Sequence, residues 1–135
     1  MAVAGWLIDK SALVRIGESK AVAKWVERIQ SGLVHMSSIT RLEVAYSARS
    51  AVDLEKSFST PPLTHLRIEP LSPAIEERAW EVIQQLAKRG QHRAPSIPDL
   101  LIAATAERCG LVLLHVDKDF ELIAKFTKQR LERLS

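Results

Sequence analysis

Four acidic residues stand where a folded chain can bring side chains together: Asp9, Glu43, Asp99 and Asp117. Asp9 and Asp117 each follow an apolar run of strand length, whereas Glu43 and Asp99 fall in the first turns of expected helices. Four of the five aspartates border an apolar strand or open a helix. The acids expected to face solvent are mostly glutamates. The aspartates are therefore the first candidates for a functional site.

Carboxylates that share one crevice repel each other, so such a set needs either protonation of some members or a compensating cation. Hard oxygen ligands with neither histidine nor cysteine nearby suit Mg²⁺ or Mn²⁺ rather than zinc. Such an ion activates a water for in-line attack on phosphorus and neutralises the leaving oxygen. The acid set therefore favours hydrolysis of phosphodiester bonds.

Each acid also has a purely structural interpretation. Glu43 and Asp99 each lie three places after a threonine or serine, which fits the capping box of a helix start. Asp9 and Asp117 fit simple N-caps, whose oxygens accept the free amide protons of a first turn. The metal-site interpretation depends on whether these helix starts converge on one crevice, and both interpretations stay open for any one acid.

The elements that must position these acids follow from hydrophobic periodicity. Strands are expected at residues 3–8, 33–36, 66–71 and 111–116, and helices at 19–31, 37–49, 51–58, 74–89 and 97–109. The strand at 66–71 is expected at the sheet edge because charged and apolar residues alternate in it. Residues 125–135 fit either a fraying helix or a last edge strand.

Strands that alternate with helices predict the α/β class: a three-layer α/β/α domain with a central parallel sheet of four or five strands. A chain of 135 residues corresponds to one domain, residues 1–135. In such open sheets, ligands bind beyond the carboxyl ends of the strands, where the strand order reverses. If the strands before Asp9 and Asp117 are neighbours at that point, the two acids face each other.

Composition bounds the class of protein. Hydrophobic residues make up 47% and charged residues 26%, which is typical of a globular domain, and no apolar run approaches the ~20 residues that span a bilayer. The N-terminal segment has no basic region before its short apolar run, so we expect a first strand rather than a signal peptide, and a cytoplasmic protein with no membrane partner. The net charge of +3 is compatible with a polyanionic partner.

Four segments in order carry a resemblance to a known family: LIDKSAL, SITRLEVAYSAR, SIPDLLIAATAE and LLHVDKDFELIA. Together they resemble the PIN-domain ribonucleases, and most closely the VapC toxins of bacterial type II toxin–antitoxin pairs. The resemblance covers nearly the whole chain. It implies that Asp9, Glu43, Asp99 and Asp117 hold Mg²⁺ or Mn²⁺ in a catalytic site.

The same resemblance implies roles for three further residues. Ser11 matches a hydroxyl residue that steadies the site through a hydrogen bond, and Asp119 matches a frequent additional acid. Lys10 replaces the threonine that usually stands between the first acid and that serine. Contact of Lys10 with a substrate phosphate and exposure of Lys10 to solvent are two open alternatives.

The resemblance also implies partners: a single-stranded or loop RNA such as tRNA or ribosomal RNA, cleaved to leave a 5′-phosphate, a second copy in a homodimer, and an inhibitory VapB-type antitoxin. One rival is a non-catalytic RNA- or protein-binding domain of the same fold, with acids that only cap helices. A second rival is a receiver-type signalling domain. It lacks support, because no strand between those bearing Asp9 and Asp117 ends in an aspartate.

The remaining polar and aromatic residues have mainly structural interpretations. Single-residue expectations are a packed sheet position for His115, a buried helix position for Cys109, and core positions for Trp6, Trp25 and Trp80. The single cysteine excludes an internal disulfide. His92 and Arg93 belong to a basic link before Asp99, for which a solvated loop is favoured and contact with an RNA backbone is the alternative.

Overall fold

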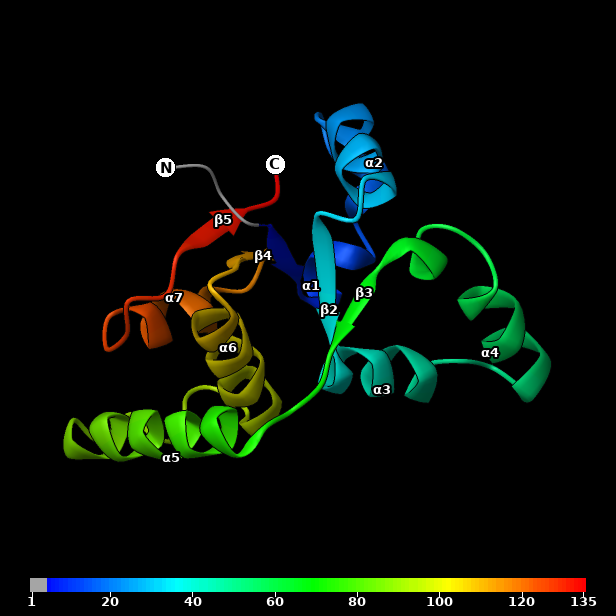
Figure 1. Cartoon of the computed structure of the whole chain (residues 1–135). Coiled ribbons are helices and arrows are strands. Elements are labelled where there is room, and N and C mark those ends of the chain that lie inside the picture. Colours follow the sequence, from blue (N-terminus) through cyan, green and yellow to red (C-terminus); the bar gives the residue numbers. More distant parts are fainter. Residues whose placement is uncertain (1–4) are drawn as a thin grey trace.

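The computed structural model describes residues 5–135, which form a five-stranded parallel sheet with helices on both faces (Figure 1). The strands are β1 (Trp6–Ile8), β2 (Val34–Ser37), β3 (Arg67–Glu69), β4 (Val112–His115) and β5 (Leu131–Arg133). They lie in the order β3-β2-β1-β4-β5, and every neighbouring pair is parallel. The predicted α/β class is confirmed. Residues 3–4 of the first expected strand lie outside the described residues.

The helices alternate with these strands along the chain. They are α1 (Lys10–Leu13), η1 (Ile16–Glu18), α2 (Val22–Gln30), α3 (Ser38–Tyr46), α4 (Ala51–Phe58), η2 (Leu63–His65), α5 (Pro73–Lys88), α6 (Ile97–Cys109) and α7 (Lys118–Ala124). Within residues 5–135, no helix combines the length and the apolar character needed to cross a bilayer.

Two hydrophobic cores cover the two faces of the sheet, because neighbouring strand residues point in opposite directions. Leu7 and Leu113 belong to a core made with α5, α6 and α7. Ile8 and Leu114 belong to a second core made with α1 and α2. The three layers are therefore those expected from the sequence, and Figure 1 shows α5, α6 and α7 grouped on one side of the sheet.

The strand order reverses between β1 and β4, which are direct neighbours. Leu7 pairs with Leu113 and Ile8 with Leu114, so both strands end at the same level. The backbone N–H of Asp9 donates to the carbonyl oxygen of Leu114 over 3.0 Å. The expectation that the acids following these strands share one edge of the sheet is confirmed.

The C-terminal segment is an edge strand, which resolves the two alternatives left by the sequence. β5 pairs in parallel with β4, with Leu114 opposite Glu132. The buried side chain of Gln129 donates from Nε2 to the carbonyl oxygens of Leu111, at 3.1 Å, and Arg130, at 2.8 Å. This segment therefore completes the sheet beyond β4.

Two single-residue expectations are wrong. Trp80 is 58% exposed, because it follows the buried Ala79 and so lies about 100° round the axis of α5 from the core. Cys109 is exposed at the last position of α6, with its Sγ atom 3.7 Å from Glu69 Oε2. Trp25 is buried as expected, and Trp6 packs edge-on against it with ring centroids 5.4 Å apart.

The start of α3 also differs from expectation. The N-cap is Ser37, whose Oγ accepts from the N–H groups of Ile39 and Thr40. The capping-box interpretation of Glu43 is therefore wrong, and its carboxylate is not engaged at the helix start. The sequence puts Leu42 and Tyr46 in helical register with Ile39, and both are exposed in the structure.

Candidate active site

Asp9 is held in place by hydrogen bonds from one neighbour. As the buried N-cap of α1, it accepts at Oδ2 from the Ser11 backbone N–H over 3.1 Å and from Ser11 Oγ over 2.6 Å. Ser11 Oγ in turn accepts from the N–H of Val116 over 3.2 Å. Ser11 thus links the end of β1 to the end of β4, which is the steadying contact expected of this hydroxyl.

Three aspartates lie together beyond β4 and at the start of α6. Carboxylate oxygens of Asp99, Asp117 and Asp119 all lie within 4.8 Å of one another. Asp117 is the N-cap of α7 and accepts at Oδ1 from the Asp119 N–H over 2.9 Å. Asp99 lies in the first turn of α6, whose N-cap Ser96 accepts from the Asp99 N–H over 3.2 Å. Ser96 and Asp117 therefore do cap their helices. The same geometry also brings the carboxylates of Asp99, Asp117 and Asp119 together.

Glu43 lies on α3 and interacts with Asp9. Its Oε1 atom is buried and accepts no hydrogen bond from residues 5–135. Burial raises the pKa of Glu43, the charge of Asp9 raises it further, and Lys10 opposes both. A buried carboxylate oxygen without a donor is costly, so a cation at this position would satisfy it.

The electrostatics join the two groups of acids. Burial raises the pKa of Asp99 from its usual 3.8 to about 6, hydrogen bonds from Ser96 oppose the shift, and the charges of Asp117 and Asp9 add to it. Asp9 therefore interacts with Glu43 on one side and with Asp99 on the other. A set of oxygen donors with mutual repulsion and one orphaned oxygen fits a hard divalent cation.

His115 supports the site through the backbone. It is 1% exposed, and its Nδ1 accepts from the Asp117 N–H over 3.1 Å. Burial lowers the pKa of His115, so the ring is neutral and Nδ1 serves as an acceptor. The structural role expected for this histidine is confirmed.

The two basic residues predicted as possible RNA contacts differ in setting. Lys10 reaches from α1 to α3, where its Nζ donates to Ser47 Oγ, and it lies beside Glu43. Arg93 is exposed in the loop that precedes α6. Lys10 therefore forms part of the wall beside Glu43, and contact of Arg93 with RNA stays a prediction.

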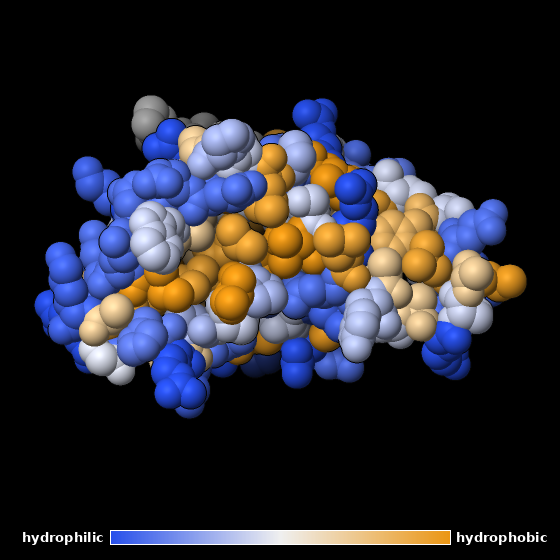
Figure 2. Space-filling view, turned by 90° about the horizontal axis from the view of Figure 1, so that it is seen from below, coloured by the Kyte–Doolittle hydropathy of each residue, from blue (hydrophilic) through white to orange (hydrophobic). Residues whose placement is uncertain are grey.

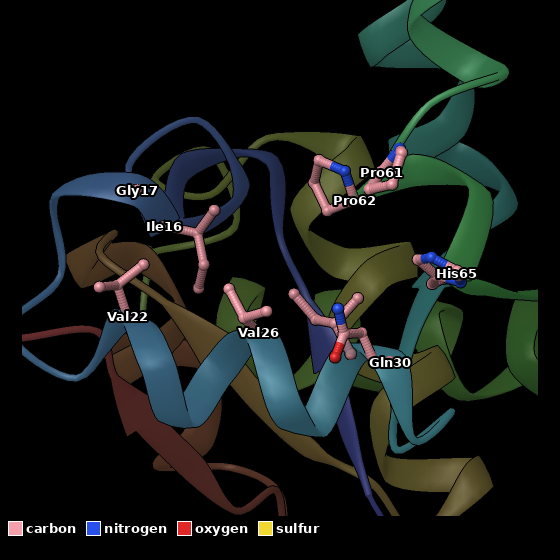
Figure 3. A pocket seen from close by; sticks show the side chains of 9 residues that line it. Ile16, Gly17, Val22, Val26, Gln30, Pro61, Pro62 and His65 are labelled. Atoms are coloured by element: carbon pink, nitrogen blue, oxygen red, sulfur yellow. The ribbon is translucent and has the colours of Figure 1, made fainter.

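A second hollow of about 220 Å³ lies between η1, α2 and the loop with the cis Pro61–Pro62 bond (Figure 3). Val26 lines it and is 44% exposed. Aliphatic side chains, the two prolines, Gln30 and His65 form its wall, with no carboxylate among them. This hollow is therefore not the acidic site.

A model of the PIN domain matches residues 6–126 of the chain. Ribonuclease VapC2 of Mycobacterium tuberculosis (strain CDC 1551 / Oshkosh) is 56% identical over 130 residues, which cover 96% of this chain and 92% of the relative. The chain belongs to the PIN-domain family, among the VapC ribonucleases. Ribonuclease VapC51 of M. tuberculosis (strain ATCC 25618 / H37Rv) is 39% identical over 92% of this VapC-family chain and 88% of its own length. The resemblance drawn from the motifs is confirmed.

Solved structures share the PIN fold at low identity. VapBC from Salmonella typhimurium bound to DNA superposes with a TM-score of 0.76 at 18% identity, covering 96% of this chain and 97% of that one. VapBC-5 from M. tuberculosis gives a TM-score of 0.69 at 19% identity, with coverage of 97% and 99%. At such identities the likeness concerns the fold alone.

Of the predicted acids, the structure groups Asp99 with Asp117, places Asp9 as an electrostatic neighbour of Asp99, and places Glu43 as a neighbour of Asp9. Asp119 joins the closest group directly, although its homologous position suggested only an accessory role. The D-x-D spacing after β4 was the available signal, because the N-cap geometry of Asp117 brings the residue two places later alongside.

Proposed function

We propose that this chain is a Mg²⁺- or Mn²⁺-dependent endoribonuclease, a single PIN domain over residues 1–135 that acts as the toxin of a VapBC-type pair. The observation that carries the proposal is the trio of aspartate carboxylates within 4.8 Å of one another, with the orphaned Glu43 oxygen near Asp9. Membership of the PIN family leaves the receiver-type alternative without support.

In this proposal, Asp9, Glu43, Asp99 and Asp117 hold the ion, and Asp119 and Ser11 support them. Mg²⁺ or Mn²⁺ bound there would activate a water nucleophile and neutralise charge on the phosphate. The chain's own part is to fix the ligands. Ser11 orients Asp9, and the neutral ring of His115 holds the Asp117 backbone. Outer contacts of this kind tune metal sites strongly.

The defining experiment is cleavage of a single-stranded RNA by the purified chain. We expect products with a 5′-phosphate in Mg²⁺ or Mn²⁺ and none in EDTA, because the carboxylates alone provide no electrophile for the phosphate. Asp99→Asn protein purified in parallel controls for contaminating ribonuclease. RNA binding without cleavage in either metal would favour the non-catalytic alternative, and cleavage that persists in EDTA would contradict the metal-dependent mechanism.

An antitoxin partner follows from the neighbours of the fold. VapBC2 from Rickettsia felis and a toxin–antitoxin complex from Klebsiella pneumoniae are among the matching structures. We propose a VapB-type antitoxin that places a basic side chain among the acids, since opposite charges complement each other at such an interface. We also propose that the protein acts on tRNA or ribosomal RNA in the cytoplasm, where these substrates lie.

A homodimer is the third partner proposal, and an apolar surface supports it. Figure 2 shows the lower face, on which α3 and α5 lie, crossed by a band of hydrophobic side chains. A hollow of about 230 Å³ between α5 and α6 is lined in part by Trp80, Ile83 and Ile97. Trp80 and Ile97 are 58% and 69% exposed. Contiguous apolar surface of this kind marks association sites.

Trp80→Glu is expected to shift the protein from dimer to monomer in sedimentation velocity, because it places a charge in an apolar contact. The far-ultraviolet circular dichroism should stay unchanged, since Trp80 is exposed in the single chain, and the melting temperature should fall only by the contribution of dimerisation. Trp80→Phe is the matched control and should remain dimeric. A Trp80→Glu protein that is still a dimer would place the interface on another face.

A further inference from the structure

The outer face of α3 is unusually apolar for a surface beside a charged site. Tyr46, the single tyrosine of the chain, is 92% exposed, and Leu42 is 64% exposed one turn before it. Helical spacing places them on one side, but nothing among residues 5–135 packs over them. Two large exposed side chains that lie together form a surface suited to ligand binding.

These two side chains line a cavity of about 320 Å³, together with Lys10, Ile39 and Glu43. Glu43 is shared between this cavity and the acidic site, where it interacts with Asp9. The cavity therefore adjoins the acids, and a ligand there lies next to whatever the acids hold.

Lys10 supplies the cavity's positive charge in a fixed position. Its Nζ donates to Ser47 Oγ, and Ser47 Oγ donates to the carbonyl oxygen of Glu43 over 3.1 Å. The lysine thus crosses from α1 to the C-terminal end of α3, where a helix favours a cation. This arrangement favours contact of Lys10 with a substrate phosphate over exposure of Lys10 to solvent.

We propose that this cavity binds the nucleotide adjacent to the scissile phosphate, with its base stacked on Tyr46 over Leu42 and its phosphate contacting Lys10. The inference rests on the proposed ribonuclease function. An RNA strand with one phosphate at the acids can reach the cavity by passing Glu43, which lines the cavity and interacts with Asp9. An exposed aromatic ring with a neighbouring cation is the combination by which proteins hold unpaired bases. The lysine beside the ring favours a ligand that carries a phosphate as well as an aromatic base.

Direct binding is tested without catalysis. Because Tyr46 is the single tyrosine, 3-fluorotyrosine labels this position alone. Titration of a short single-stranded RNA in EDTA should shift the ¹⁹F resonance, because a stacked base changes the ring's environment. An oligonucleotide that binds, as seen by fluorescence anisotropy, without moving this resonance would overturn the proposal.

Cleavage kinetics then distinguish a loss of base stacking from a general loss of activity. Tyr46→Ala should lower kcat/KM for RNA cleavage about 10-fold, while Tyr46→Phe keeps the ring and the rate. An abasic nucleotide beside the cleaved bond should cost wild type a similar factor and cost Tyr46→Ala almost nothing, because the contact is already lost. Val52→Ala removes another exposed apolar side chain, 76% exposed on α4 and outside the cavity, and should cleave normally.

The outcomes distinguish this inference from the function on which it rests. If wild type does not cleave RNA, the ribonuclease proposal fails. If wild type cleaves and Tyr46→Ala cleaves equally well, only the nucleotide site fails. If Tyr46→Ala instead weakens self-association or antitoxin binding with cleavage unchanged, the surface is a protein interface and the nucleotide site is overturned.

Discussion

Asp99→Asn should abolish Mg²⁺-dependent RNA cleavage and at the same time stabilise the metal-free protein. The variant keeps the size and the backbone contact with Ser96 but loses the charge that a cation requires. Because even outer contacts of metal ligands are worth 10–100-fold, loss of a ligand should cost at least about 100-fold in kcat/KM. Asp9→Asn should likewise abolish cleavage. Retained cleavage in both variants would contradict the assignment of the metal site.

The gain in stability follows from the raised pKa of Asp99. The folded state holds this proton up to about pH 6, whereas the unfolded chain releases it near 3.8. The folded protein therefore binds more protons between these values, and its free energy of unfolding falls as pH rises through this window. Above pH 6 the penalty is complete, and its upper limit is about 3 kcal/mol. Partial exposure of Asp99 reduces it, so we expect about 1–2 kcal/mol.

Urea denaturation in EDTA at several pH values measures this effect. Asp99→Asn should be more stable than wild type at pH 7 and equal to it below about pH 3, where Asp99 is protonated in both the folded and the unfolded state. A difference that is independent of pH would mean that charge is not its cause. Added Mg²⁺ should stabilise wild type and leave the variant nearly unchanged, because a ligand stabilises only the state that binds it.

Arg78→Leu should cause a large loss of stability at a position remote from the acidic site. Arg78 binds Glu107 in a bidentate manner, with Nε to Oε1 at 2.5 Å and Nη2 to Oε2 at 3.3 Å. Glu107 also accepts from the backbone N–H of Lys128 over 3.0 Å. Arg78 lowers the pKa of Glu107, which shows how strongly the carboxylate depends on it. The pair thus connects α5, α6 and the segment before β5.

Removal of the arginine leaves a largely buried carboxylate without its cation. The side chains of Arg78 and Glu107 are 20% and 16% exposed. Breaking fully buried pairs costs about 3–5 kcal/mol, so this pair should cost about 2–3, or on the order of 10 °C in Tm.

Two variants control for the Arg78 result in thermal unfolding. Arg49→Ala removes an ion pair with Asp53 at 3.9 Å in which the arginine is 90% exposed, and it should cost less than about 0.5 kcal/mol. The double variant Arg78→Leu/Glu107→Leu should recover much of the loss, because no unpaired charge remains. A double variant as unstable as Arg78→Leu would show that packing, and not the orphaned charge, dominates.

The fold was predictable because its signals are local. Short segments of sequence indicate the apolar runs that end at Asp9 and Asp117 and the helix starts at Ser96 and Ser72. The structure contains all of these elements. The acids were predictable for the same reason, since parallel strands place their carboxyl ends together. The Ser37 cap was missed because several hydroxyl residues precede α3, and only the backbone conformation selects one.

What could not be predicted depends on contacts between distant segments. Periodicity says which residues share a helix face but not whether anything covers it. The core position expected for Trp80 was therefore wrong, and the exposure of Leu42 and Tyr46 could not be predicted. The ion pair of Arg78 with Glu107 joins α5 to α6, and the sequence of neither helix alone predicts it. The exposed residues Trp80, Leu42 and Tyr46 are the ones that the partner and nucleotide proposals use.

The edge strand β5 has a consequence for proteolysis. β4 is buried along its whole length and carries Asp117 at its end, and β5 shields its outer edge. Removal of residues 129–135 would turn β4 into an open edge, which pairs readily with other chains. Trimming of this short tail by a cellular protease would then both disturb the acids and promote aggregation, so a tail remote from the chemistry limits the lifetime of the enzyme.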